Sequence, residues 1–92
     1  MLQALQNTAT GVRLAAVQAL AAFPDSRTSA AVVEALAHDD VPAVRAMAAQ
    51  TLRILGAAGT IPALEAALAD RDPAVQDEAR RALKVLGGNT VR

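Results

Sequence analysis

The chain of 92 residues lacks several residue types from which common functional sites are built. It has no cysteine, and therefore no disulfide, thiol nucleophile or thiolate metal ligand. Tryptophan and tyrosine are absent and Phe23 is the single phenylalanine, so the chain has no platform for stacking nucleic-acid bases. His38 is the only histidine, so a transition-metal site would have to rely on carboxylates. These absences argue against nucleophilic, metal-dependent and base-stacking sites.

The chain also lacks an excess of one charge and a long apolar run. Nine basic and nine acidic residues give a formal net charge of zero, which removes the attraction expected of a dedicated nucleic-acid or anionic-membrane binder. No apolar run reaches 18 residues, and residues 1–13 lack the basic segment that opens a secretory signal. We therefore expect a cytoplasmic protein without a membrane span.

Alanine supplies nearly half of the apolar residues. These residues are 24 Ala, 11 Leu, 9 Val, 2 Ile, 2 Met and 1 Phe, so only 25 positions carry a larger apolar side chain. The usual core of a small globule, built on aromatic and branched side chains, is not available. Because Ala is the best helix former and lets helix axes approach closely, the composition predicts closely packed helices and no sheet.

The sequence repeats with a period of about 31 residues. Three longer segments (11–23, 43–55 and 74–86) align with one another, and shorter stretches aligned through Leu5, Leu36 and Leu68 lie between them. In each longer segment the apolar residues recur at steps of three and four, which predicts one buried stripe of an α-helix. The three stripes are Val12, Ala16, Ala19, Leu20 and Phe23; Val44, Ala48, Thr51, Leu52 and Leu55; and Val75, Ala79, Ala82, Leu83 and Leu86.

Local signals mark the ends of these helices. Asp72 before Pro73 predicts a helix start, Thr10 is a candidate cap for the first longer helix, and Gly56 and Gly87 are typical C-terminal caps. The shorter helices are predicted over residues 26–37 and 60–69.

One hairpin of a shorter and a longer helix cannot bury its apolar stripe alone, so the copies must stack. The sequence therefore predicts an all-α fold, an α-solenoid of about three stacked helical hairpins in a single domain. Its parts are a partial repeat (1–23), two full repeats (24–56 and 57–88) and a short tail (89–92).

One run carries a family resemblance. Leu55-Gly, then Ile-Pro-Ala-Leu64, then Ala-Leu68, then Asp72-Pro-Ala-Val75 is similar to the HEAT-like repeat named after phycobilisome lyases. The resemblance covers nearly the whole chain. It implies a right-handed solenoid of the armadillo/HEAT kind in which the second helix of each hairpin lines the concave face. Members of the family are mostly protein-binding scaffolds; some are lyase or chaperone subunits that handle bilins, and a few bind DNA.

The resemblance also implies a polar ladder between repeats, formed by an Asp in the loop before the second helix and an Arg just after the Val. In this chain the ladder residues would be Asn7 with Arg13, Asp39 with Arg45, and Asp70 with Gln76. Only Asp39 with Arg45 keeps both charges. Because a neutral amide forms weaker hydrogen bonds than a charged group, the pattern predicts one charged rung and an interrupted ladder.

No catalytic constellation is evident. His38 lies at the end of a short helix, where it complements the helix dipole, and no second histidine accompanies it. The acidic pairs Asp39 with Asp40 and Asp70 with Asp72 lie in loops suited to capping and to bonds between repeats. Ser26 and Ser29 begin a helix without a base nearby in the pattern. We therefore expect a protein that is not an enzyme and that needs no cofactor or metal.

The charges are distributed unevenly, and this suggests a binding surface. Six of the nine basic residues lie on the longer helices, whereas the acids concentrate in loops and on the shorter helices. The sequence thus predicts a mildly basic groove on the second helices that holds an acidic or extended polypeptide. Its predicted residues are Arg13, Arg45, Ala49, Arg53, Arg80, Arg81 and Lys84. A face that is merely solvated, with bases placed to favour the helix dipole, is the alternative interpretation of this pattern.

Other functions stay open at this point. The runner-up is a subunit or chaperone of a phycobilin-lyase-type enzyme, and nucleic-acid binding is a further alternative. The last longer helix carries Leu83, Val85 and Leu86 near the end of the array. Either this chain is a piece of a longer array, or its open ends are covered by self-association.

Overall fold

The computed structural model describes residues 2–87, so the predicted tail of residues 89–92 lies outside the described part. In this part the chain is helical, with no strand. None of the described helices is long and apolar enough to cross a bilayer. With η marking 3-10 helices, the elements are η1 (Leu2–Gln6), α1 (Thr10–Ala19), η2 (Leu20–Ala22), α2 (Ser26–His38), α3 (Pro42–Leu55), η3 (Ala58–Thr60), α4 (Ile61–Ala67) and α5 (Pro73–Leu86).

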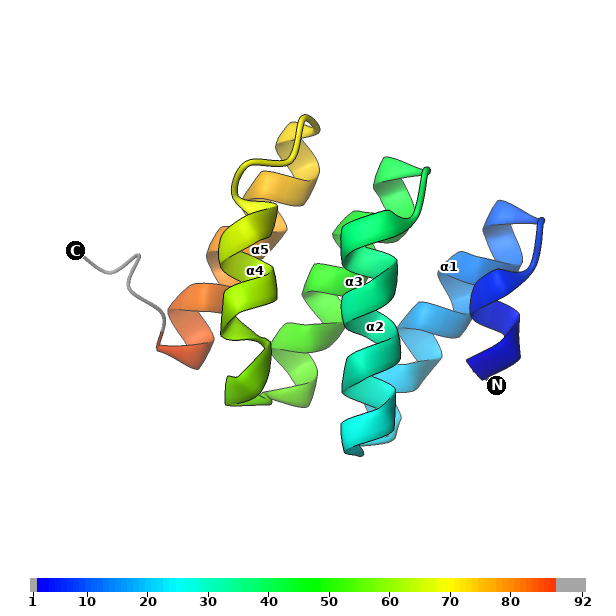
Figure 1. Cartoon of the computed structure of the whole chain (residues 1–92), viewed down its shortest axis with the longest axis horizontal. Helices are drawn as coiled ribbons and strands as arrows, with labels where there is room; N and C mark the ends of the chain where they lie inside the picture. The colour runs from blue at the N-terminus through cyan, green and yellow to red at the C-terminus, as the bar shows by residue number, and fades with distance from the viewer. Residues whose placement is uncertain (1, 88–92) are drawn as a thin grey trace.

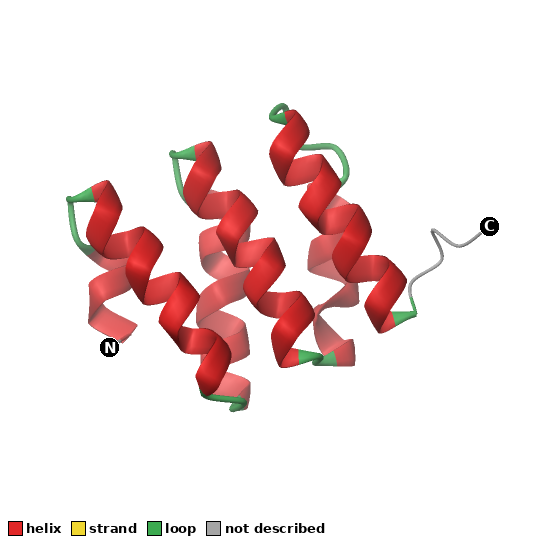
Figure 2. Cartoon of the chain, turned by 180° about the vertical axis from the view of Figure 1, so that it is seen from behind, coloured by secondary structure: helices red, strands yellow, loops and turns green. Residues whose placement is uncertain are grey.

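The helices form two layers. The first elements of the hairpins, η1, α2 and α4, lie in one layer, and the second elements, α1, α3 and α5, lie side by side in the other (Figures 1 and 2). The central long helix, α3, packs against α1, α2 and α5. This arrangement confirms the predicted all-α solenoid of stacked hairpins.

Several predicted helix ends agree with the structure. Gly56 and Gly87 are the C-terminal caps of α3 and α5, with φ of 71° and 83°, a left-handed conformation that glycine adopts without steric cost. Pro73 is the first residue of α5 and Asp72 its N-cap position, but the Asp72 side chain accepts no capping hydrogen bond. Thr10 was predicted as a cap and is instead the first residue of α1.

The shorter helices begin differently from one another. Asp25, and not Ser26, caps α2, since its carboxylate accepts a hydrogen bond of 2.7 Å from the Arg27 N–H. The predicted helix 60–69 is an α-helix only over Ile61–Ala67, preceded by η3. The first stretch forms the short 3-10 helix η1, which packs on α1 and α2.

The core lies between the two layers and between the long helices. The predicted rows of the second and third repeats supply much of it, because Val44, Leu52, Val75 and Leu83 are fully buried. Thr51 is also buried, and its hydroxyl donates a hydrogen bond of 3.0 Å to the Val17 carbonyl oxygen of α1. This bond joins the long helices of two neighbouring hairpins.

The predicted stripe of the first repeat is partly wrong. Ala16 and Leu20 are buried, but Val12 is 42% exposed, Phe23 is 51% exposed and Ala19 is exposed. In α3 the residue equivalent to Ala19 is Thr51, which faces the long helix of the preceding hairpin. No described helix precedes α1 on that side, so the same row of α1 faces solvent.

Candidate functional site

Polar rungs connect successive hairpins at the turn before each long helix. Asp39 and Asp70 each fold the turn locally: their Oδ1 atoms accept hydrogen bonds from the N–H two residues later, of Val41 at 3.0 Å and Asp72 at 2.9 Å. Asn7 does the same for Ala9 at 2.8 Å. The three loops therefore share one geometry, whether the residue is Asp or Asn.

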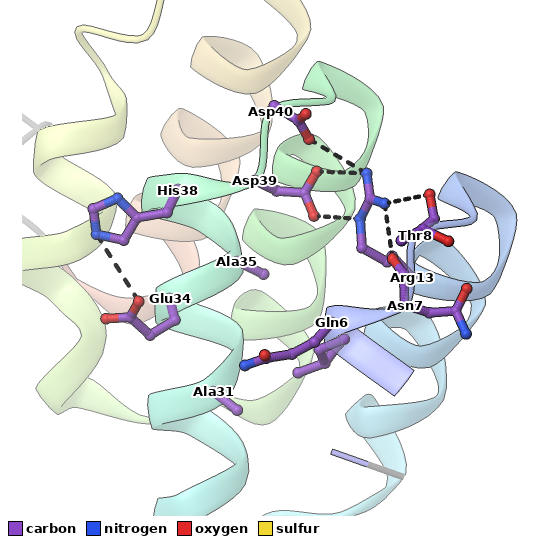
Figure 3. A pocket seen from close by; sticks show the side chains of 11 residues that line it. Gln6, Asn7, Thr8, Arg13, Ala31, Glu34, Ala35, His38, Asp39 and Asp40 are labelled. Atoms are coloured by element: carbon purple, nitrogen blue, oxygen red, sulfur yellow. Dashed lines mark hydrogen bonds and ion pairs between the residues drawn. The ribbon is translucent and has the colours of Figure 1, made fainter. Parts of the chain in front are cut away.

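Each aspartate then pairs with the arginine of the preceding hairpin. The Arg13 guanidinium donates to Asp39 from Nε at 2.9 Å and from Nη2 at 3.2 Å (Figure 3). Arg45 donates to Asp70 in the same way, at 2.9 and 3.1 Å. Bidentate pairs of this kind are among the strongest hydrogen bonds in proteins. All four side chains are largely buried, with exposed fractions of 7–16%.

These contacts correct the pairing that the family resemblance implied. Arg45 meets Asp39 only through the main chain, because its Nη1 donates to the Asp39 carbonyl oxygen at 2.8 Å. Gln76 donates to the Asp70 carbonyl oxygen in the equivalent way, and Arg13 donates to the Asn7 carbonyl oxygen at 2.9 Å. The side chain that follows the repeated Val thus binds the main chain of the loop in its own repeat. The two arginines among these residues, Arg13 and Arg45, also bind the next repeat. The ladder has two charged rungs, one more than predicted.

The rungs shift the pKa of the groups that form them. The hydrogen bond from Arg45 lowers the pKa of Asp70, and burial raises it by less. Burial raises the pKa of Asp39, but the hydrogen bonds from Arg13 and the Val41 N–H, together with the charges of Arg13 and Arg45, outweigh burial, so its pKa is also lowered. Hydrogen bonding to these carboxylates raises the pKa of Arg13 and Arg45. Both ion pairs therefore stay fully charged at neutral pH.

Three residues of the predicted basic groove form contacts between repeats instead. Arg13 and Arg45 point along the stack toward the next repeat and are held there by carboxylates. Ala49, four positions beyond Arg45 on the same side of α3, is fully buried in the core. It cannot contact a partner. The side of α3 that carries Arg45 and Ala49 packs against the next hairpin.

The other predicted groove residues remain near the surface. Arg80 pairs with Asp77 at 2.8 Å and Arg81 with Glu78 at 3.1 Å, both within α5. Arg53 of α3 is half-buried and Lys84 of α5 is exposed. Neither Arg53 nor Lys84 forms an ion pair with another residue of the described part. What remains of the predicted basic groove thus lies in the C-terminal halves of α3 and α5.

An apolar pair lies at the same ends. Ile54 is 58% exposed and Val85 is 63% exposed, and they occupy equivalent positions on neighbouring long helices. Leu83, Val85 and Leu86 lie together in the sequence near the end of the array. Leu83 is fully buried and Leu86 is half-buried, so of the three only Val85 is exposed.

A groove that sequence reasoning missed lies on the opposite layer. It has a volume of about 690 Å³ between η1 and α2, close to the first rung (Figure 3). His38 and Glu34 stand on one side of it, 3.9 Å apart, and Gln6 lies on the other. The sequence carries no signal for this groove, because the groove depends on how far apart η1 and α2 pack. No group of three metal-ligating side chains occurs within residues 2–87.

The stacked two-layer hairpins and the polar rungs between them define a helical-repeat protein. A scan against protein families matches residues 1–84 to HEAT repeats. The chain therefore belongs to the HEAT-repeat family, whose repeats generally mediate protein–protein interaction. A search of curated proteins gave no significant match.

Proposed function

We propose that this chain is a non-enzymatic protein-interaction module that binds an acidic, partly apolar polypeptide segment across the C-terminal ends of α3 and α5. The exposed pair Ile54 and Val85 carries the proposal. Exposed large apolar side chains are ordinary when single, but Ile54 and Val85 occupy equivalent positions near the C-terminal ends of two long helices, α3 and α5, that lie side by side (Figure 2). This pair suits the apolar side chains of a bound segment.

The charges beside this pair indicate the chemistry of the partner. Arg53 precedes Ile54 and Lys84 precedes Val85, and Arg81 is exposed one turn earlier on α5. Three cations near two apolar side chains favour a segment that carries Asp or Glu next to aliphatic residues. This surface is smaller than the groove predicted from the sequence, because Arg13, Arg45 and Ala49 belong to the contacts between repeats.

Peptide binding tests the proposal directly. The probe is a fluorescent peptide that alternates Glu with Leu, and its affinity is measured by anisotropy at low and at physiological salt. We expect Ile54→Ser with Val85→Ser, and separately Arg53→Gln with Lys84→Gln, to weaken binding about tenfold. In the Arg53 and Lys84 variant, the peptide affinity should also depend less on the salt concentration.

A matched control separates this surface from general electrostatics. Arg27 and Arg71 are exposed bases that do not lie at the ends of α3 and α5, so Arg27→Gln with Arg71→Gln changes the net charge by the same amount. Equal weakening by the control and by the Arg53 and Lys84 variant would refute the assigned surface. Unchanged affinity in the Ile54 and Val85 variant would do the same.

A role as subunit or chaperone of a phycobilin-lyase-type enzyme is the second candidate. It is favoured by the run from Leu55-Gly through Pro62-Ala-Leu64 to Asp72-Pro73, which resembles that class of repeat. Mixing the protein with free bilins tests it. A shifted bilin absorption band would support the chaperone role, and an unchanged spectrum at saturating protein would exclude it.

A further inference from the structure

The groove between η1 and α2 has a small apolar floor and polar walls. Ala31 and Ala35 of α2 and Leu5 of η1 supply apolar surface. Glu34 and His38 alternate with the alanines along the same side of α2, and Asp39 and Asp40 follow at its end (Figure 3). Gln6, Asn7 and Thr8 face them from the other side. The groove thus combines a shallow floor with hydrogen-bonding groups on both walls.

The groove lies where η1 and the loop after it pack beside α2. The α2 residues that line it include Ala31 and Ala35, whose methyl groups leave space between the two elements. The volume of about 690 Å³ is in the range of sites that hold small ligands or a few residues of a peptide.

The charge of the lining is negative. Its three carboxylates, Glu34, Asp39 and Asp40, face a single arginine, Arg13, which leaves a formal charge of −2 with His38 neutral. Arg13 is already engaged by Asp39, and its contact with Asp40 is longer, 3.4 Å to a carboxylate that is 91% exposed. The side chain of Glu34 is 76% exposed. Two accessible carboxylates therefore flank an apolar floor.

We propose that this groove binds a basic polypeptide segment, with a lysine or arginine side chain placed between Glu34 and Asp40. The aliphatic stem of such a side chain can lie on Ala31 and Ala35 while its cation reaches the carboxylates. The groove is a second interaction surface, with chemistry opposite to that proposed at the ends of α3 and α5, and on the other layer of the solenoid.

NMR titration tests the proposal with a capped octapeptide that alternates Ala with Lys. We expect amide shifts at Gln6 to Thr8, Ala31, Ala35 and His38, and smaller shifts at the ends of α3 and α5. Replacing Glu34→Gln and Asp40→Asn together should weaken this binding about five- to tenfold, because two exposed charge pairs are lost. An octapeptide that alternates Ala with Glu should give no shifts in the groove.

The matched control is Glu65→Gln with Asp77→Asn, which removes the same charge from exposed positions outside the groove. Circular dichroism confirms that each variant is folded. Equal weakening by both double variants would overturn the proposal, since it would mean attraction to net charge alone. Shifts confined to residues outside the groove would also overturn it. Because the probe here is basic and the test of the proposed function uses an acidic one, either proposal can fail without the other.

Discussion

Arg45 and Asp70 form a bidentate ion pair across the boundary between two hairpins, with Nε to Oδ2 at 2.9 Å and Nη2 to Oδ1 at 3.1 Å. The side chains are only 16% and 13% exposed. Arg45 simultaneously donates to the Asp39 carbonyl oxygen of its own repeat. One guanidinium thus holds two turns together, and the pair fixes how one repeat is placed on the next.

Removing the charge of Asp70 should destabilise the stack. Asp70→Asn can keep the turn, because Asn7 forms the same turn in the first repeat, but it loses the ion pair with Arg45. We expect a loss of about 1–3 kcal/mol in the free energy of unfolding, measured with urea. Asp40→Asn, at a side chain that is 91% exposed, is the control and should change stability by less than about 0.5 kcal/mol. Equal losses would show that the rung contributes no more than a surface charge.

The two rungs should make stability depend on acid pH. The pKa values of Asp39 and Asp70 are lowered from 3.8 in the folded chain, so the unfolded chain takes up protons first as the pH falls. The stabilisation is therefore complete above about pH 5 and is lost as the pH falls below 4. Thermal melting from pH 7 to 2 should show this decline, and Asp39→Asn with Asp70→Asn should flatten it. A decline of the same size in the double variant would assign it to other carboxylates.

Among Leu→Ala substitutions at the equivalent positions Leu20, Leu52 and Leu83, the one at Leu52 should lower the free energy of unfolding most. Leu52 of α3 is fully buried in a helix that packs on α1, α2 and α5, whereas Leu20 is the C-cap residue of α1, which among the described residues packs on one long helix, α3. We expect Leu52→Ala to lose about 3–5 kcal/mol, with smaller losses for Leu20→Ala and Leu83→Ala. Urea unfolding of the three variants checks the order. Equal losses would contradict a stack in which the middle unit has neighbours on both sides.

Enlarging Ala49 should disturb the contact between repeats. Ala49 is fully buried on the side of α3 that faces the next hairpin, so Ala49→Leu overpacks this contact and should cost about 1–3 kcal/mol. Arg80 occupies the same position in α5 and is exposed, and Arg80→Leu should change stability by less than about 0.5 kcal/mol. If Ala49→Leu were tolerated equally well, this face would not be closely packed.

The candidate surfaces were harder to predict than the fold. An apolar stripe at helical spacing distinguishes a buried side from the rest of a helix, but a helix in a stack has neighbours in several directions. Positions next to the stripe, such as Arg45 and Ala49, were therefore assigned to a groove although they face the following repeat. Likewise, the family resemblance paired Asp39 with Arg45, six residues later, whereas the Asp39 carboxylate binds Arg13, 26 residues earlier.

By itself the sequence determined the hairpin repeat, its period, the glycine caps at Gly56 and Gly87 and most of the buried rows. These depend on local propensity and on helical periodicity, which a single segment already contains. Only the tertiary structure decided that Arg13 pairs with Asp39, that Ala49 is buried, and that a groove opens between η1 and α2. Each of these depends on the position of a neighbouring repeat, and that position is set by packing among all the hairpins and not by any one of them.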